Sequence, residues 1–135
     1  MVVALASVLA LTWGIRTPDD VLYGKATYYN SNIMEQVVAN RGLDLEGHVG
    51  AVALNRKGDL LRTVWLRWED GTVTGPCLVA DCSYFGHYED RVRKGYVVEV
   101  DAETAKERGF YRVGPVEVEV WFYDPKVDSD PRARA

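Results

Sequence analysis

Two aspartates in this chain, Asp81 and Asp101, each stand at the end of a short apolar run, twenty residues apart. The first follows the run 77–80 and the second follows the run 96–100. A carboxylate at the end of a buried strand lies where the sheet meets solvent, so the fold can present it to a ligand without burying a charge. We therefore expect the two aspartates to face one polar groove.

A pair of carboxyl groups in one groove suits the cleavage of a glycosidic bond, in which one group protonates the leaving oxygen and a positively charged sugar centre is stabilised. The residue pattern predicts a helix that begins directly after Asp101, and a helix N-terminus favours the anion. We therefore predict Asp81 as the proton carrier and Asp101 as its orienting partner, although the two roles could be reversed.

Both aspartates also have a structural interpretation. Asp101 precedes the helical pattern 102–108 and stands three residues before Thr104, which is the arrangement of an N-cap. Asp81 could order the loop that follows it through a hydrogen bond. The sequence leaves these readings open beside the catalytic ones.

The chain contains two cysteines, Cys77 and Cys82. If both lie on one strand, extended geometry separates them by roughly 16 Å, whereas a disulfide needs Cα atoms within about 7 Å. We therefore expect two free thiols, with Cys82 the more exposed. No histidine stands at ligand spacing from them, so we predict no metal and no cofactor.

The composition fits one domain of 135 residues with a compact core, since 47% of the residues are hydrophobic. The net charge of −4 disfavours nucleic acid and anionic lipid as main partners, because both require a basic face. Neutral or mixed-charge polysaccharide remains open. The 4 Trp and 8 Tyr suit sugar stacking and suit a β-rich core equally well.

The first fifteen residues are apolar and uncharged. They are too short for a typical membrane span of about 20 residues, but they resemble the apolar part of a secretory signal without its basic start. We expect export to the cell envelope or medium, with the segment either cleaved or kept as an anchor. The alternative is a first strand or helix of the core. The chain then divides into a leader and linker (1–20), a domain (21–123) and a disordered tail (124–135).

The domain is predicted to be mainly β, with six short strands and two short helices. Strands are expected over 24–29, 51–54, 63–68, 73–81, 96–100 and 116–122, and helices over 33–40 and 102–108. The residues 69–72 predict a hairpin turn, Gly75 and Pro76 predict a bend within the following strand, and 83–95 is read as a long polar loop.

The order of several segments resembles the rare lipoprotein A-like family of double-psi β-barrels, to which expansin-like domains are related. The segments that carry the resemblance are Gly24-Lys25-Ala26-Thr27-Tyr28-Tyr29, Ala51-Val52-Ala53-Leu54-Asn55-Arg56, Thr63-Val64-Trp65-Leu66, Leu78-Val79-Ala80-Asp81-Cys82 and Val98-Glu99-Val100-Asp101-Ala102-Glu103-Thr104-Ala105. The resemblance covers residues 24–122. It implies a six-stranded barrel with a surface groove for glycan chains.

The resemblance also implies functional positions. Asp81, Asp101 and Thr27 match polar residues of the family, Asn55 stands where relatives have a histidine, and Cys82-Ser83-Tyr84 replaces the family's Arg-Gly-Pro after the first aspartate. We take Asp81 and Asp101 as candidate catalytic residues. The candidate substrate-binding residues are Thr27, Tyr29, Asn55, Tyr84 and His87.

The sequence therefore predicts an exported, monomeric domain that binds cell-wall glycan such as peptidoglycan. Cleavage of the glycan as a lytic transglycosylase is one possibility, in which the sugar's own hydroxyl is the nucleophile. The alternatives are an expansin-like module that binds or loosens polysaccharide without cutting it, and a barrel that mediates protein contacts.

Overall fold

The computed structural model describes residues 21–83 and 88–126. The predicted leader, the candidates Tyr84 and His87, and residues 127–135 of the predicted tail lie outside the described residues. In chain order, the elements are β1 (Val21–Tyr28), α2 (Ile33–Asn40), β2 (Gly50–Leu54), the 3-10 helix η2 (Lys57–Asp59), β3 (Thr63–Trp68), β4 (Val73–Cys82), α3 (Tyr88–Lys94), β5 (Tyr96–Val100), α4 (Ala102–Glu107) and β6 (Val116–Trp121).

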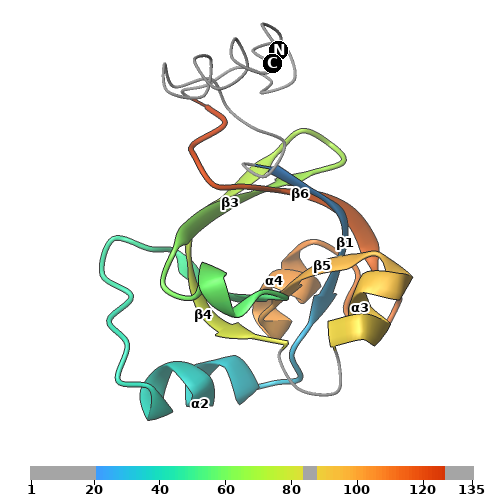
Figure 1. Cartoon of the computed structure of the whole chain (residues 1–135). Coiled ribbons are helices and arrows are strands. Elements are labelled where there is room, and N and C mark those ends of the chain that lie inside the picture. Colours follow the sequence, from blue (N-terminus) through green and yellow to red (C-terminus); the bar gives the residue numbers. More distant parts are fainter. Residues whose placement is uncertain (1–20, 84–87, 127–135) are drawn as a thin grey trace, which may run out of the picture.

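The six strands form a closed barrel in the order β1-β5-β2-β4-β3-β6 (Figure 1). Two neighbouring pairs, β1 with β5 and β2 with β4, are parallel, and the other four pairs are antiparallel. Because the barrel is closed, each of the six described strands has a neighbouring strand on both sides. The prediction of a mainly β chain with a six-stranded barrel is thus confirmed.

The pairing pattern has an internal symmetry. Exchanging β1, β2 and β3 with β4, β5 and β6 converts the parallel pair β1/β5 into β4/β2 and the antiparallel pair β1/β6 into β4/β3. The antiparallel pairs β2/β5 and β3/β6 are converted into themselves. Each half of the domain therefore contributes three strands in equivalent positions.

The barrel interior is filled by alternate residues of the strands, because successive side chains of a strand point to opposite faces. Val98 and Val100 of β5 point inward, for example, while Glu99 between them points outward. The α4 helix and the turn after it add Ala105 and Phe110 to the same core. The fully buried members include Val52, Leu54, Val64, Leu66, Val79 and Val120.

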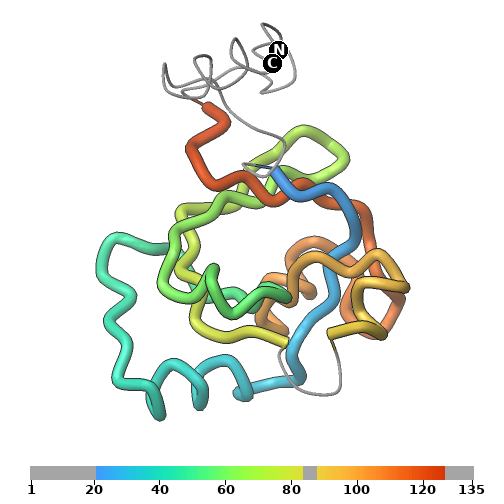
Figure 2. The backbone as a smooth tube through the Cα atoms, in the orientation of Figure 1, coloured from blue at the N-terminus to red at the C-terminus, as the bar shows by residue number. Residues whose placement is uncertain are grey.

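The α2 helix covers part of the outer face of β2 and β4. Its buried residue is Met34, which packs with Ala51, Ala53 and Ala80. Figure 2 shows the chain from α2 to the start of β2 running outside the barrel wall. Ile33, the first residue of the helix, is 43% exposed because Met34 and the partly buried residues after it turn toward the barrel instead.

The described residues contain three α-helices, and the prediction of two was therefore wrong. The additional helix is α3, inside the segment 83–95 that its polar composition marked as a loop. Its Arg91 is buried, and Asp90 forms ion pairs with Arg93 and Lys94 at spacings of three and four residues. Such pairs stabilise a short helix that has little apolar surface.

The β1 strand approaches β5 closely at Gly24. A Cβ atom at this position would lie 2.5 Å from the carbonyl oxygen of Gly95 and 2.7 Å from a methyl group of Val97. The next residue, Lys25, donates its backbone N–H to the same Gly95 carbonyl at 2.8 Å. The parallel pairing that begins there therefore depends on the absence of a side chain at residue 24.

Cys77 and Cys82 are both free thiols, as predicted, and Cys77 is buried while Cys82 is partly exposed. The predicted hairpin is also present, since β3 and β4 pair in antiparallel fashion, and their register shifts between Val64 and Leu66, opposite the Gly75–Pro76 bend. Within residues 21–83 and 88–126, we find no helix with the length and apolar character needed to span a bilayer.

Candidate functional site

Four adjacent strands place one residue each in a single line across the barrel wall. Thr27 of β1 pairs with Glu99 of β5, Glu99 pairs with Ala53 of β2, and Ala53 pairs with Asp81 of β4. Paired residues on neighbouring strands lie on the same face of a sheet. We call Thr27, Glu99, Ala53 and Asp81 the polar row, and it lies on the outer face because the residues flanking Glu99 fill the core.

Asp81 forms one end of the polar row and accepts two hydrogen bonds. The Tyr29 hydroxyl donates to its Oδ2 at 2.8 Å, and Nη2 of Arg41 donates to its Oδ1 at 2.9 Å. The side chain of Asp81 is 20% exposed and that of Arg41 is 46% exposed. Burial and the Asp81 hydrogen bond raise the pKa of Tyr29 above its ordinary value, so the phenol keeps its proton and donates a hydrogen bond to the carboxylate.

Glu99 lies in the middle of the polar row and has two partners on its Oε1. Ser83 donates its hydroxyl at 3.2 Å, and Nη1 of Arg91 forms an ion pair at 3.4 Å. The side chains of Glu99 and Arg91 are 18% and 10% exposed. The site thus contains a largely buried ion pair, which is supported by a further hydrogen bond to the acid.

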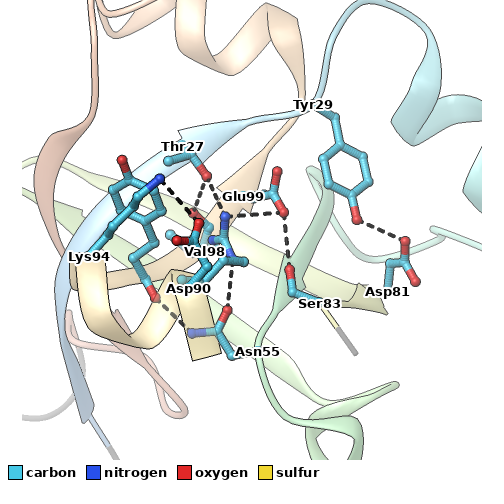
Figure 3. A network of polar contacts seen from close by, with 11 residues as sticks. Thr27, Tyr29, Asn55, Asp81, Ser83, Asp90, Lys94, Val98 and Glu99 are labelled. Carbon is cyan, nitrogen blue, oxygen red and sulfur yellow. Dashed lines mark hydrogen bonds and ion pairs between the residues drawn. The ribbon is translucent and has the colours of Figure 1, made fainter. Parts of the chain in front are cut away.

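Arg91 connects α3 to three strands or loops of the barrel. Its Nε donates to Oδ1 of Asn55 at 2.9 Å, and its Nη1 donates to Oγ1 of Thr27 at 3.1 Å (Figure 3). The Asn55 amide in turn donates from Nδ2 to the backbone oxygen of Tyr96 at 2.7 Å. The guanidinium is therefore held in one orientation, with its charge directed at Glu99.

Asp101 has a different environment. Its Oδ1 accepts a hydrogen bond from the backbone N–H of Thr104 at 2.9 Å, so it is the N-cap of α4, as one of the two sequence interpretations predicted. It lines a cleft of about 480 Å³ together with Glu103 and Glu107. Among the contacts of the described residues, none joins Asp101 to the polar row.

The structure therefore assembles four of the residues predicted from the sequence, namely Thr27, Tyr29, Asn55 and Asp81. The expectation that Asp81 and Asp101 share a groove has no support among the described contacts, and Glu99 takes the place beside Asp81 instead. The sequence analysis missed Ser83, Arg91 and Glu99. For Glu99 a signal was present, because it is the charged residue at an outward position of an otherwise apolar strand.

The polar row and its partners offer both acceptors and donors to a ligand. Asp81 and Glu99 are partly exposed carboxyl groups, and Arg41 is an exposed donor beside Asp81. This combination can form several hydrogen bonds with a polyhydroxylated molecule. Within the described part of the chain, no group of three or more histidine, cysteine or acidic side chains is arranged to hold a metal ion.

A scan against models of protein families found no match, and a search of curated proteins found no similar sequence.

Proposed function

We propose that this chain is a glycan-binding domain of the double-psi β-barrel class, similar to rare lipoprotein A and to expansin-like domains, which grips a cell-wall polysaccharide through the polar row. The single observation that supports this proposal best is the alignment of Thr27, Glu99 and Asp81 across four adjacent strands on the outer face of the barrel. Sugar hydroxyl groups both donate and accept hydrogen bonds; the row presents the carboxylate acceptors, and the exposed Arg41 beside Asp81 presents a donor.

The strand pairing supports the double-psi assignment. A barrel of this class consists of two interlocked halves of equivalent topology, and the pairing pattern found here is unchanged when the first three strands are exchanged with the last three. The apolar segment 1–15 supports export, which would bring the domain to the cell envelope.

The partners of the two acids favour binding over cleavage. A general acid must approach the glycosidic oxygen as a protonated carboxyl group. Asp81 and Glu99 instead each accept hydrogen bonds or ion pairs from guanidinium and hydroxyl donors. Such acids are suited to accept hydrogen bonds from sugar hydroxyls, so we propose a domain that holds glycan without cutting it.

The experiment is a sedimentation assay with purified peptidoglycan and, in parallel, with insoluble chitin, in which bound protein and soluble products are both measured. The variants are Asp81→Asn and Glu99→Gln, which keep the size of each side chain. Asp101→Asn is the matched control, because asparagine also serves as an N-cap. We expect the wild type and the control to sediment with the glycan and both site variants to remain in solution.

Two other results would replace the proposal. Release of anhydro-sugar products that is lost in Glu99→Gln or Asp81→Asn would identify a lytic transglycosylase. Wild-type protein that stays in solution with every polysaccharide would exclude glycan binding and leave the barrel as a protein-contact domain.

A further inference from the structure

Three clefts on the barrel differ in the charge of the residues that line them. The cleft at Asp101 is lined by three acids and no base, and a second, at Tyr23, is lined by Glu69, Glu117 and Glu119 with one arginine. The third has a volume of about 290 Å³, and Arg112 is its single charged lining residue. In a chain with a net charge of −4, this cleft offers a ligand a positive charge without a competing carboxylate.

We call this third cleft the Arg112 cleft. The residues that line it are Thr27, Tyr28, Phe110, Arg112, Val113, Gly114 and Pro115. They belong to the end of β1 and to the turn between α4 and β6. Thr27 is also a member of the polar row, so the cleft and the proposed glycan site share a residue.

The Arg112 side chain is exposed and has no carboxylate within ion-pair distance in the described part of the chain. Its guanidinium lies 5.3 Å from the centre of the Tyr111 ring. The other cation over this ring, Lys106, is paired with Glu103 at 3.3 Å. Arg112 is therefore a cation whose hydrogen-bonding capacity is available to a ligand.

The turn that carries Arg112 is held in place before any ligand arrives. The backbone N–H of Arg112 donates to the Tyr28 hydroxyl at 3.0 Å, and the Tyr28 and Tyr111 rings lie 5.0 Å apart. The backbone N–H of Val113 donates to the Phe110 oxygen at 3.0 Å. A site that is ordered in advance loses less entropy when it binds.

We propose that the Arg112 cleft is a subsite for a sugar ring that carries a carboxylate, next to the polar row on the same bound glycan. This inference rests on the proposed function and specifies its substrate as an acidic polysaccharide. A guanidinium fork matches the two oxygens of a carboxylate. Tyr28 adds an aromatic ring to the wall of the cleft, where the apolar face of a sugar can pack.

The test compares two soluble oligosaccharides of equal length by isothermal titration calorimetry on the full chain. One is chitotetraose, which is neutral, and the other alternates N-acetylglucosamine with glucuronic acid. The variant is Arg112→Gln, and the control is Lys126→Gln, which removes the same charge from an exposed residue beyond the opposite end of β6. Thermal unfolding of each variant checks that the fold is retained.

We expect the wild type and Lys126→Gln to bind the acidic oligosaccharide about tenfold more tightly than chitotetraose. Arg112→Gln should bind both with the wild-type affinity for chitotetraose. A wild type that binds both oligosaccharides equally, or an Arg112→Gln variant that keeps the preference, would overturn the subsite and leave the proposed function intact. If the wild type binds neither oligosaccharide, the proposed function itself is wrong, and the subsite proposal is wrong as well.

Discussion

Asp81 and Glu99 are cross-strand partners of the same residue, Ala53, from the two sides of β2. Adjacent strands lie about 4.8 Å apart, so the two acids are separated by roughly 10 Å across the barrel wall. Ala53 is buried because it packs with Met34 of α2, so the two acids lie on either side of that contact. Burial, the Asp81 hydrogen bond and the charges of the two acids all raise the pKa of Tyr29, and the charge of Arg91 opposes them.

The first prediction separates the polar row from Asp101. Glu99→Gln should weaken glycan binding by about tenfold or more, because each strong hydrogen bond to a charged group contributes about 1.5–3 kcal/mol. Asp101→Ala should leave binding unchanged and lower the free energy of unfolding by about 1 kcal/mol, because it removes the cap of α4. Binding isotherms and urea denaturation measure the two effects. A loss of glycan binding in Asp101→Ala at wild-type stability would show that Asp101 belongs to the binding site.

The second prediction concerns the buried ion pair. Arg91→Met removes the guanidinium and leaves Glu99 with Ser83 as its described hydrogen-bond donor. We expect a loss of about 3 kcal/mol in the free energy of unfolding, because the largely buried Glu99 carboxylate loses its guanidinium partner. The double variant Arg91→Met with Glu99→Gln should recover part of this loss. Additive effects in urea denaturation would show that the pair is not coupled.

The third prediction uses the raised pKa of Tyr29. Its proton is bound more tightly in the folded state than in the unfolded state, where the pKa has its ordinary value of 10.0. The resulting stability is fully present below pH 10.0 and is lost as the pH rises further, since only the unfolded chain then releases the proton. Tyr29→Phe should reduce the slope of stability against pH in this alkaline range. Parallel curves for wild type and variant would contradict the assignment.

The fourth prediction concerns the two free thiols. Burial raises the pKa of Cys77 to about 12, and burial together with the Asp81 charge also raises that of Cys82. At pH 8, a thiol reagent such as Ellman's reagent should label Cys82 slowly and Cys77 only after unfolding. Cys82→Ser should therefore abolish labelling of the native protein. Native labelling that requires Cys77 would mean that β4 opens readily.

The fifth prediction tests the close contact of β1 and β5. Gly24→Ala should destabilise the barrel by about 2 kcal/mol or more, because the new methyl group meets the Gly95 backbone. Gly58→Ala is the matched control, since no atom lies within 4 Å of its added Cβ atom. Chemical denaturation of both variants provides the comparison. Equal stabilities would mean that the two strands can separate slightly at low cost.

Much of the barrel could be predicted from local patterns. Alternation of apolar and polar residues identified the strands, and the Glu69–Thr72 turn fixed the pairing of β3 with β4. The sequence placed Asp81 in the site, but it placed Asp101 there as well. Strand register determines which of the two acids, Glu99 or Asp101, lies in the polar row with Asp81. Register depends on long-range pairing that a single sequence does not specify.

The contribution of α3 could not be predicted in the same way. Its helix lacks an apolar stripe, because the residue that packs inward is Arg91, which is counted as polar in any hydrophobic pattern. The ion pairs of Asp90 with Arg93 and Lys94 were the available signal. A buried arginine becomes recognisable only when its partners from β1, from β5 and from Asn55 directly after β2 are brought together by barrel closure.

The most direct test of the central claim is a nuclear magnetic resonance titration of the isotopically labelled chain with soluble peptidoglycan fragments. We predict that the largest chemical-shift changes occur at Thr27, Glu99 and Asp81, with saturable binding that is lost in Glu99→Gln. Changes concentrated instead at Asp101, Glu103 and Glu107, or no changes at all, would contradict the assignment of the polar row as a glycan site.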